Sequence, residues 1–238
     1  MRNSKIAKLL GKIVLLLVIL ATSFFGYLYI KYNDDLPIGE QGVAADTLAH
    51  NMLEALNYEA YQNTNYLEWT FRNTNHYKWD KNKGKCEVIW KDFKVILDFN
   101  ASDNNRAFVH NFEVQDEQAN ELIDKAVRYF NNDSFWLIAP YKVFDKGTSR
   151  QLIRLEDGKT GLLVTYSQGG STPGDSYLWQ FDATGKPSSF RMWTSIIPIQ
   201  GLKASWEGWI TSESGATLPT KHKIAFLTLN MGEVKGTK

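Results

Sequence analysis

The residue types that most often carry chemistry are sparse here, and none has the spacing of a metal site. The four histidines are His50, His76, His110 and His222, and none has a second His or a Cys at a zinc-ligand spacing. A histidine in such a setting is more often a satisfied core or rim residue than a ligand. We therefore expect no metal site and no cofactor.

The glycine-rich stretch 168–174 also lacks the features of a catalytic loop. Ser171 stands one position too early for the Gly-x-Ser-x-Gly nucleophile elbow, and Pro173 interrupts the pattern. Gly169-Gly170 lacks the following Lys and Ser or Thr of a phosphate loop. A Ser-His-Asp set can be assembled from distant residues, which spacing does not test. We expect that the protein is not an enzyme, and we keep an enzyme as the least favoured interpretation.

Aromatic side chains are the more informative signal. The chain contains 8 Trp, 11 Tyr and 13 Phe, and aromatics at this density fill a β-rich core or line an apolar cavity. A concave apolar surface is the usual site for a small ligand. The expected lining residues alternate along predicted strands and are Trp69, Phe71, Trp79, Leu97, Phe108, Phe112, Leu162, Val164, Trp179, Phe181, Met192 and Trp206.

The segment Ser134–Gly147 is apolar and aromatic but follows neither the helix nor the strand period. Pro140 breaks any long helix, so we expect one short helical turn and a loop packed on the sheet. Such a loop usually plugs the end of a core. A sharper interpretation is a lid over the cavity, formed by Phe135, Trp136, Pro140 and Tyr141.

An antiparallel sheet and two helices are predicted to position these side chains. Apolar residues alternate along five short strands within 66–114 and six within 150–229, with turn residues between them. Single apolar stripes predict amphipathic helices over 43–60 and 116–131. The predicted fold class is α+β, with about eleven strands in one curled half-barrel that the two helices cover or plug. Several strands are apolar on both faces, which requires a cover on one face and a filled or ligand-holding concavity on the other.

The stretch Ile13–Ile30 carries no charged residue and is preceded by four basic residues and no acid. At 1.5 Å per residue it spans roughly 27 Å, close to the hydrocarbon core of a bilayer. The basic flank predicts a cytoplasmic N-terminus, with the chain after Ile30 on the other side of the membrane. The alternative is a signal peptide cleaved near Ala21-Thr22-Ser23, although the apolar run continues beyond that point.

These patterns divide the chain into four parts. Residues 1–30 form the cytoplasmic stub and transmembrane anchor, residues 31–42 a linker reaching at most about 40 Å, residues 43–229 the folded domain, and residues 230–238 a frayed tail. Residues 32–238 hold 22 basic and 26 acidic side chains, and this net charge of −4 argues against nucleic acid or anionic lipid headgroups as partners. Cys86 is the single cysteine, so no internal disulfide forms and the N-terminus carries no cysteine for acylation.

The order of predicted elements over 43–229 resembles the LolA/LolB lipoprotein-carrier superfamily of bacterial envelopes, with a helix, a half-barrel and closing helices. The segment containing Trp136, Pro140-Tyr141-Lys142, Asp145 and Gly147 also resembles a segment of uncharacterised LolA-like proteins of Bacteroidetes-type bacteria. The resemblance implies that the half-barrel holds acyl chains or a lipid-modified protein. No site residue is transferred from those carriers. LolA-type carriers are soluble and LolB-type receptors are lipid-anchored, whereas this chain is predicted to be anchored by a protein helix.

Two functional hypotheses follow. The first is a single-pass protein of the bacterial inner membrane whose periplasmic domain binds the acyl chains of a lipid or lipoprotein in an apolar cavity. The second is a non-enzymatic protein-interaction or envelope-sensor domain with a filled core. The two differ in whether the interior is hollow.

Overall fold

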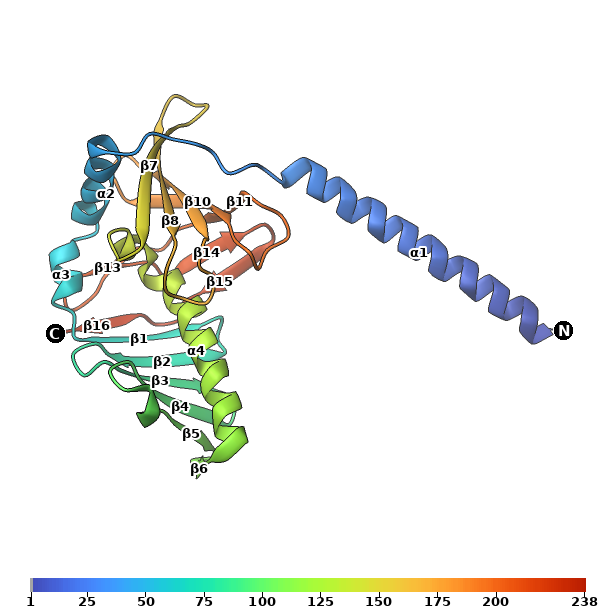
Figure 1. Ribbon diagram of the computed structural model, residues 1–238, viewed down its shortest axis with the longest axis horizontal. Helices are drawn as coiled ribbons and strands as arrows, with labels where there is room; N and C mark the ends of the chain where they lie inside the picture. Colours follow the sequence, from blue (N-terminus) through green and yellow to red (C-terminus); the bar gives the residue numbers. More distant parts are fainter. Residues whose placement is uncertain (1) are drawn as a thin grey trace.

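The computed structural model describes residues 2–238, with side chains described for Ile6 and from Lys8 onward. Helix α1 (Arg2–Tyr32) stands away from the rest of the chain (Figure 1). Its segment Lys8–Tyr32 is long and apolar enough to cross a membrane, and none of it is buried against the domain. The helix extends beyond the uncharged stretch at both ends, because the flanking basic residues are also good helix formers.

The domain contains two longer helices and three short ones. They are α2 (Val43–Ala55), α3 (Tyr58–Gln62), α4 (Asp116–Ile138) and the 3-10 turns η1 (Ser102–Asn104) and η2 (Ala139–Lys142). The helix predicted over 43–60 is divided at Asn57, which adopts a left-handed conformation with φ 56°. The helix predicted over 116–131 continues to Ile138, so the expected loop begins only at η2, where Pro140 lies.

All strand pairs are antiparallel, and the strands form two seven-stranded sheets and a two-stranded one. In spatial order the first sheet contains β16 (Lys235–Thr237), β1 (Tyr66–Phe71), β2 (Asn75–Asp80), β3 (Lys85–Trp90), β4 (Phe93–Asp98), β5 (Arg106–Val109) and β6 (Phe112–Val114). The second contains β15 (Leu227–Asn230), β14 (Lys221–Ile224), β11 (Leu202–Ser205), β10 (Pro187–Trp193), β9 (Ser176–Phe181), β8 (Thr160–Tyr166) and β7 (Thr148–Arg154). The two-stranded sheet pairs β12 (Ile210–Thr211) with β13 (Thr217–Leu218).

The α+β class is confirmed, whereas the single sheet of about eleven strands is replaced by these two sheets, which form no closed barrel over residues 2–238. The C-terminal segment joins them. The backbone N–H of Thr70 donates to Met231 O at 3.0 Å and that of Arg72 donates to Asn230 O at 2.7 Å, while β16 pairs with the same strand β1. The expected frayed tail, residues 230–238, is therefore wrong, because its apolar residues Met231 and Val234 are buried in the core.

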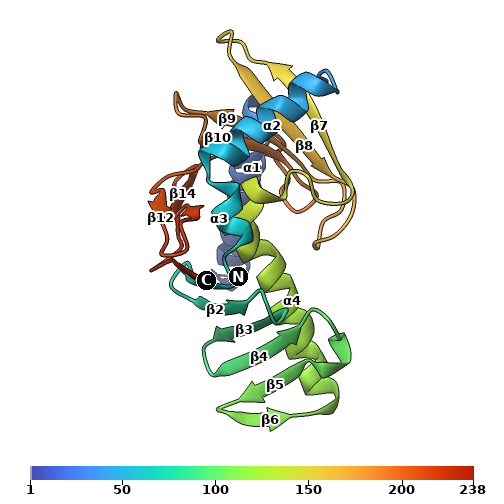
Figure 2. The same ribbon diagram turned by 90° about the vertical axis from the view of Figure 1, so that its left-hand side faces the viewer.

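Helix α4 is the element shared by both halves of the domain. Its first turns pack on β3, β4 and β5, and its C-terminal end reaches the second sheet (Figure 1). Figure 2 shows the two sheets at opposite ends of the domain, with α4 running between them. Helix α2 packs on β7 and β8 of the second sheet.

The linker between α1 and α2 is docked on the second sheet. We call Asn33–Glu40 the strap. The indole N–H of Trp193 donates to Asp34 O at 2.8 Å, and Glu40 exchanges backbone hydrogen bonds with Leu152. The strap lies beside the outer apolar cluster of Ile153, Leu163, Leu178 and Trp193, which gives that sheet face the cover that its sequence requires. Residues 31–42 therefore do not form a flexible tether of about 40 Å.

Candidate functional site

The predicted lining residues of the first sheet pack against one another and against α4. The rings of Trp69 and Tyr77 stack with centroids 4.5 Å apart, and Phe130 of α4 lies 5.2 Å from Trp79. Trp69 is fully buried, and it contacts the same ring of Phe130 at 6.4 Å. Phe71 and Leu97 are also buried in this cluster, and Trp79 is half-buried. Side chains therefore fill the space that the sequence offered as a cavity.

A buried carboxylate lies at the centre of this contact. Asp133 of α4 is 2 % exposed and accepts hydrogen bonds from the Tyr77 hydroxyl and from Asn75 Nδ2, the latter at 2.8 Å. Asn132 Nδ2 donates to its other oxygen at 2.7 Å. Burial raises the pKa of Asp133, although these three donors oppose the shift. The group fixes α4 on β2 with its acceptors satisfied, which is a structural arrangement rather than a catalytic one.

The second sheet has its own aromatic cluster. Trp136 of α4 lies 5.4 Å from Phe190 and 5.1 Å from His222, and Trp179 lies 5.0 Å from Trp206. The predicted lining residues buried around it are Leu162, Val164, Trp179, Met192 and Trp206. Burial lowers the pKa of His222 to about 4, so its ring is neutral at pH 7 and Nδ1–H donates to Ser205 O at 3.0 Å.

One feature of this filled interior is unusual. Within the described residues, five tryptophans have a buried indole N–H group that meets no hydrogen-bond acceptor, namely Trp69, Trp79, Trp90, Trp179 and Trp206. His222 Nε2 is likewise unpartnered among those residues. A buried donor without an acceptor destabilises the folded state, so this interior retains hydrogen-bonding capacity toward a group that enters it.

Two predicted lining residues lie outside these clusters, whereas Phe181 packs against them. Residues 107–114 were expected to form one strand, but His110 and Asn111 both adopt positive φ and make a two-residue hairpin turn. Phe108 pairs with Lys94, beside the buried pair of Val95 and Ala107, so it lies on the outer face, with Lys94 Nζ 4.7 Å from its ring. Phe112 follows the turn on the edge strand β6 and is 78 % exposed. These two assignments are wrong, because the register of β4 and β5 turns Phe108 to the outer face and the turn places Phe112 on an edge strand. Phe181 lies half-buried at the end of β9.

The predicted lid residues lie in the core between the two halves of the domain. The Tyr141 hydroxyl donates to Leu56 O at 2.9 Å and contacts Thr217 O at 2.5 Å, and its ring stacks on Tyr61 at 3.9 Å. Pro140 and Trp136 are buried, and Phe135 packs 4.5 Å from Tyr177. This segment thus connects α2 and α3 to the second sheet.

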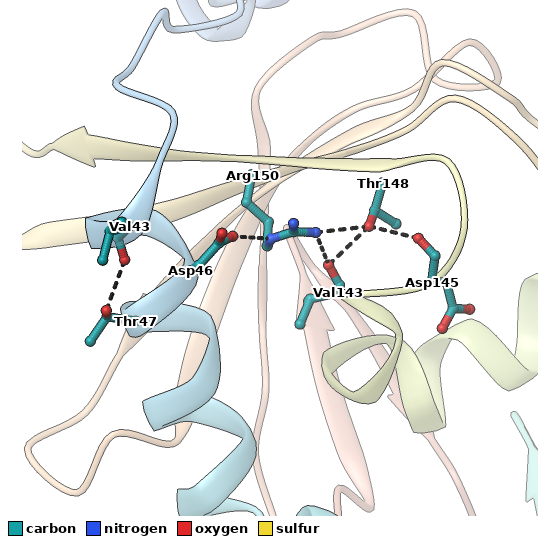
Figure 3. A network of polar contacts seen from close by, with 7 residues as sticks. All are labelled: Val43, Asp46, Thr47, Val143, Asp145, Thr148 and Arg150. Atoms are coloured by element: carbon teal, nitrogen blue, oxygen red, sulfur yellow. Dashed lines mark hydrogen bonds and ion pairs between the residues drawn. The ribbon is translucent and has the colours of Figure 1, made fainter.

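A half-buried arginine holds the end of the same segment (Figure 3). Arg150 Nε donates to Asp46 Oδ1 at 2.5 Å, and its Nη1 donates to Val143 O at 2.8 Å and to Thr148 Oγ1 at 3.0 Å. The Thr148 hydroxyl in turn donates to Asp145 O at 2.8 Å. The donors of this network end on backbone oxygens, on the Asp46 carboxylate and on the Thr148 hydroxyl, so it joins α2, β7 and the segment between them.

Sequence reasoning missed one enzyme-like arrangement on the outer face of the first sheet. Thr70 Oγ1 lies 2.9 Å from His76 Nδ1, and His76 Nε2 lies 3.3 Å from Glu68 Oε1. Alternation along two predicted strands would have placed these side chains on one face. The three sit on a pleated surface, and the Thr70 N–H is engaged by Met231 O, so it is not available to an oxyanion.

Two shallow hollows open on the surface of the described chain. One of about 500 Å³ lies on the outer face of the first sheet, among charged side chains such as Lys78, Glu87 and Arg106. The other, about 480 Å³, lies between the strap and the ends of β9 and β10. Neither is lined by the predicted apolar residues. Within the described part of the chain, no three His, Cys, Asp or Glu side chains lie close enough together to hold a metal ion.

Comparison with models of known protein families and with curated proteins found no match to this chain.

Proposed function

We propose that this chain is a single-pass protein of a bacterial inner membrane, and that its periplasmic domain is a non-enzymatic interaction or envelope-sensor domain. The apolar length of α1 and its basic flank support the anchor and its orientation. The orientation of the chain in the membrane and the periplasmic location of the domain are parts of this proposal, as the function is.

The filled interior is the observation that carries this proposal. Ten of the expected lining residues pack in the core or against it, and the two hollows described above lie at the surface, away from these residues. Trp69 and Trp179, one in each cluster, are fully buried and pack against neighbouring rings. A domain of this kind works through its outer surface, since a preformed concavity is what a small-molecule site requires.

A second candidate is the binding of a lipid or lipoprotein acyl chain, as the resemblance to LolA/LolB carriers implies. The five indole N–H groups without acceptors favour it, because an ester or phosphate oxygen entering the interior would satisfy them. Entry would require α4 to leave the first sheet, which exposes the contact between Phe130 and Trp79.

Tryptophan quenching by brominated lipid separates the two candidates. The full chain is reconstituted in nanodiscs of ordinary or acyl-brominated phosphatidylcholine. A filled interior predicts little quenching, because Trp69, Trp179 and Trp206 meet protein rather than lipid. The Trp193→Phe variant removes the tryptophan that is bonded beside the end of α1. Strong quenching that persists in Trp193→Phe would support acyl-chain binding and refute the filled interior.

A further inference from the structure

Two apolar turns lie at the end of the second sheet nearest the end of α1. They are the β10–β11 loop Ser195–Gln200 and the β14–β15 turn Ala225-Phe226, which we together call the rim. We infer that the rim inserts into the surface of the bilayer that α1 enters. This inference rests on the proposed anchor and adds a second membrane contact, made by the folded domain.

The strap fixes the β10–β11 loop at the end of α1. Helix α1 ends at Tyr32, and the next residue, Asn33, accepts a hydrogen bond from Gln200 N through its Oδ1 at 2.9 Å. Asp34 N donates to Gln200 O at 3.0 Å, and the Asp34 carboxylate forms an ion pair with Arg191. The loop is therefore bonded directly to the residues that follow the apolar helix.

The close approach of strap and loop depends on Gly201. A Cβ at this position would lie 2.9 Å from the Cβ of Asp34 and 3.0 Å from Arg191 Nη2, and Gly201 adopts φ 76°. The strap is thus accommodated by a residue without a side chain. Such a contact is specific, which argues against a linker that only happens to pass nearby.

The loop itself is ordered by its own hydrogen bonds and directs an apolar side chain outward. Gln200 Nε2 donates to Thr194 O at 3.1 Å and to Ile197 O at 2.8 Å, which closes the loop. Ile196 at its tip remains 66 % exposed. The sequence Ile196-Ile197-Pro198-Ile199 is an unusual composition for a turn in water, where polar turn residues are preferred.

The β14–β15 turn lies at the same end of the sheet. β11 begins directly after this loop and pairs with β14 through Ala204 and Ile224, so the turn following Ile224 lies next to the start of β11. Figure 1 shows this turn and the β10–β11 loop on the side from which α1 leaves. Phe226 is 92 % exposed at the tip and Leu227 is 46 % exposed beside it. Both turns therefore present exposed apolar side chains at the same end of the sheet.

A bilayer is the occupant that this position favours. Tyr27, Tyr29 and Tyr32 are exposed around the last turns of α1, where aromatic residues mark the membrane interface. The rim is held at that level by Asn33 and Asp34, and exposed Ile and Phe side chains suit the boundary between headgroups and acyl chains. A protein partner would have to displace lipid headgroups to reach the same surface.

Site-specific fluorescence in nanodiscs tests the inference on the full chain. Cysteines introduced as Ile196→Cys and Phe226→Cys carry an environment-sensitive nitrobenzoxadiazole probe. Cys86 is fully buried and burial raises the pKa of its thiol, so it labels little, and the unsubstituted chain measures that background. We expect both probes to emit at shorter wavelength than in water and to be quenched by spin-labelled lipid.

Two controls make each outcome decisive. Phe112→Cys places the probe on β6, far from the rim, where the side chain is also exposed, and its emission should match that in water. Phe24→Cys places it on α1, and quenching there reports the anchor.

Rim probes that behave like the probe at 112 while the probe at 24 is quenched would overturn the inference and leave the anchor intact. A wavelength shift without quenching by lipid would indicate a protein cover and would also overturn it. An unquenched probe at 24 would refute the anchor and the rim together.

Discussion

The two seven-stranded sheets bury their faces differently. The outer face of the first sheet is a ladder of opposite charges in register, in which Lys78 lies between Glu68 and Glu87, and only its inner face is packed on α4. The second sheet is buried on both faces, with α4 and the aromatic cluster on one side and the strap beside the other. A sheet with one polar face is completed by a helix and water, whereas one with two apolar faces needs a second cover from the chain.

The buried titratable groups of the two halves also respond oppositely to pH. The pKa of Asp133, in the first half, is raised by burial, so its contribution to stability is present at low pH and is lost as the pH rises above the ordinary carboxylate value. The pKa of His222, in the second half, is lowered, so the folded state is destabilised as the pH falls below the ordinary value of 6.5. The two effects oppose each other over mildly acidic pH.

The largest expected effect comes from breaking the junction between the sheets. Removal of residues 231–238 takes away β16 and the buried side chains of Met231 and Val234. We expect a loss of roughly 5 kcal/mol or more, since each deletion of a buried aliphatic side chain costs about 2 to 5 kcal/mol. Urea unfolding of the full chain in detergent, followed by tryptophan fluorescence, measures it. Removal of Lys238 alone is the control. Equal stability of the two truncated chains would show that residues 231–237 do not stabilise the junction between the sheets.

The next effect concerns the pH dependence of the second half. His222→Asn removes a group whose pKa falls from 6.5 to about 4 on folding, and that shift corresponds to roughly 3 kcal/mol of stability lost between those values. The variant should therefore lose less stability than the wild type when the pH is lowered from 6.5 to 4. His110→Asn, at an exposed hairpin turn, is the matched control and should keep the wild-type slope. Parallel slopes for all three chains would refute the assignment to His222.

The same substitution in each half tests the difference in burial directly. Arg150→Gln removes hydrogen bonds to Asp46, Val143 and Thr148 at a half-buried position, with an expected cost of about 2 to 3 kcal/mol. Arg106→Gln removes a solvent-exposed ion pair with Glu113 on the first sheet, and its effect should be too small to resolve. Urea midpoints of the two variants give the comparison, and a reversed order would contradict it.

The smallest effect is expected at the strap. A Cβ at Gly39 would lie 2.4 Å from both Ile153 Cδ1 and Leu152 O, so Gly39→Ala should displace the strap at a cost of about 1 to 2 kcal/mol. Trp193 should then become more accessible to acrylamide. Ile38→Ala, at a neighbouring residue that is 95 % exposed, should change stability by less than about 0.5 kcal/mol. Unchanged quenching in Gly39→Ala would show that the strap does not depend on this contact.

The regular alternation of the first sheet was the most predictable part of the fold. β1 buries every second residue, Leu67, Trp69 and Phe71, as the sequence pattern indicated. The continuous burial of residues 161–164 and 176–179 in β8 and β9 follows from their apolar composition on both faces. Phe112 was misplaced because the two-residue turn of His110 and Asn111 contains no Gly, the residue that usually indicates such a turn. Phe108 was misplaced because its face depends on the register with β4, which pairs it with Lys94.

The candidate site was less predictable than the strands. Residue type identified most of the side chains that converge inside the domain, but it did not show that Phe130 and Trp136 of α4 fill the space between them. Helix α4 passes Asn131-Asn132 because Asp133 is bound by Tyr77 and Asn75. These contacts join residues more than fifty positions apart, and such pairings leave no local pattern in the sequence.

Sequence alone determined the apolar helix, the antiparallel α+β class and the need for a cover on a sheet with two apolar faces, because length, charge and period-two burial are local properties. Tertiary structure decided which segments provide the covers. The sequence predicts a linker over residues 33–40 and a tail over residues 231–237, because both segments are mostly polar and lack the period of a helix or a strand. Backbone hydrogen bonds to Leu152 and Thr70 place them on the sheets, and any residue except proline can donate such bonds.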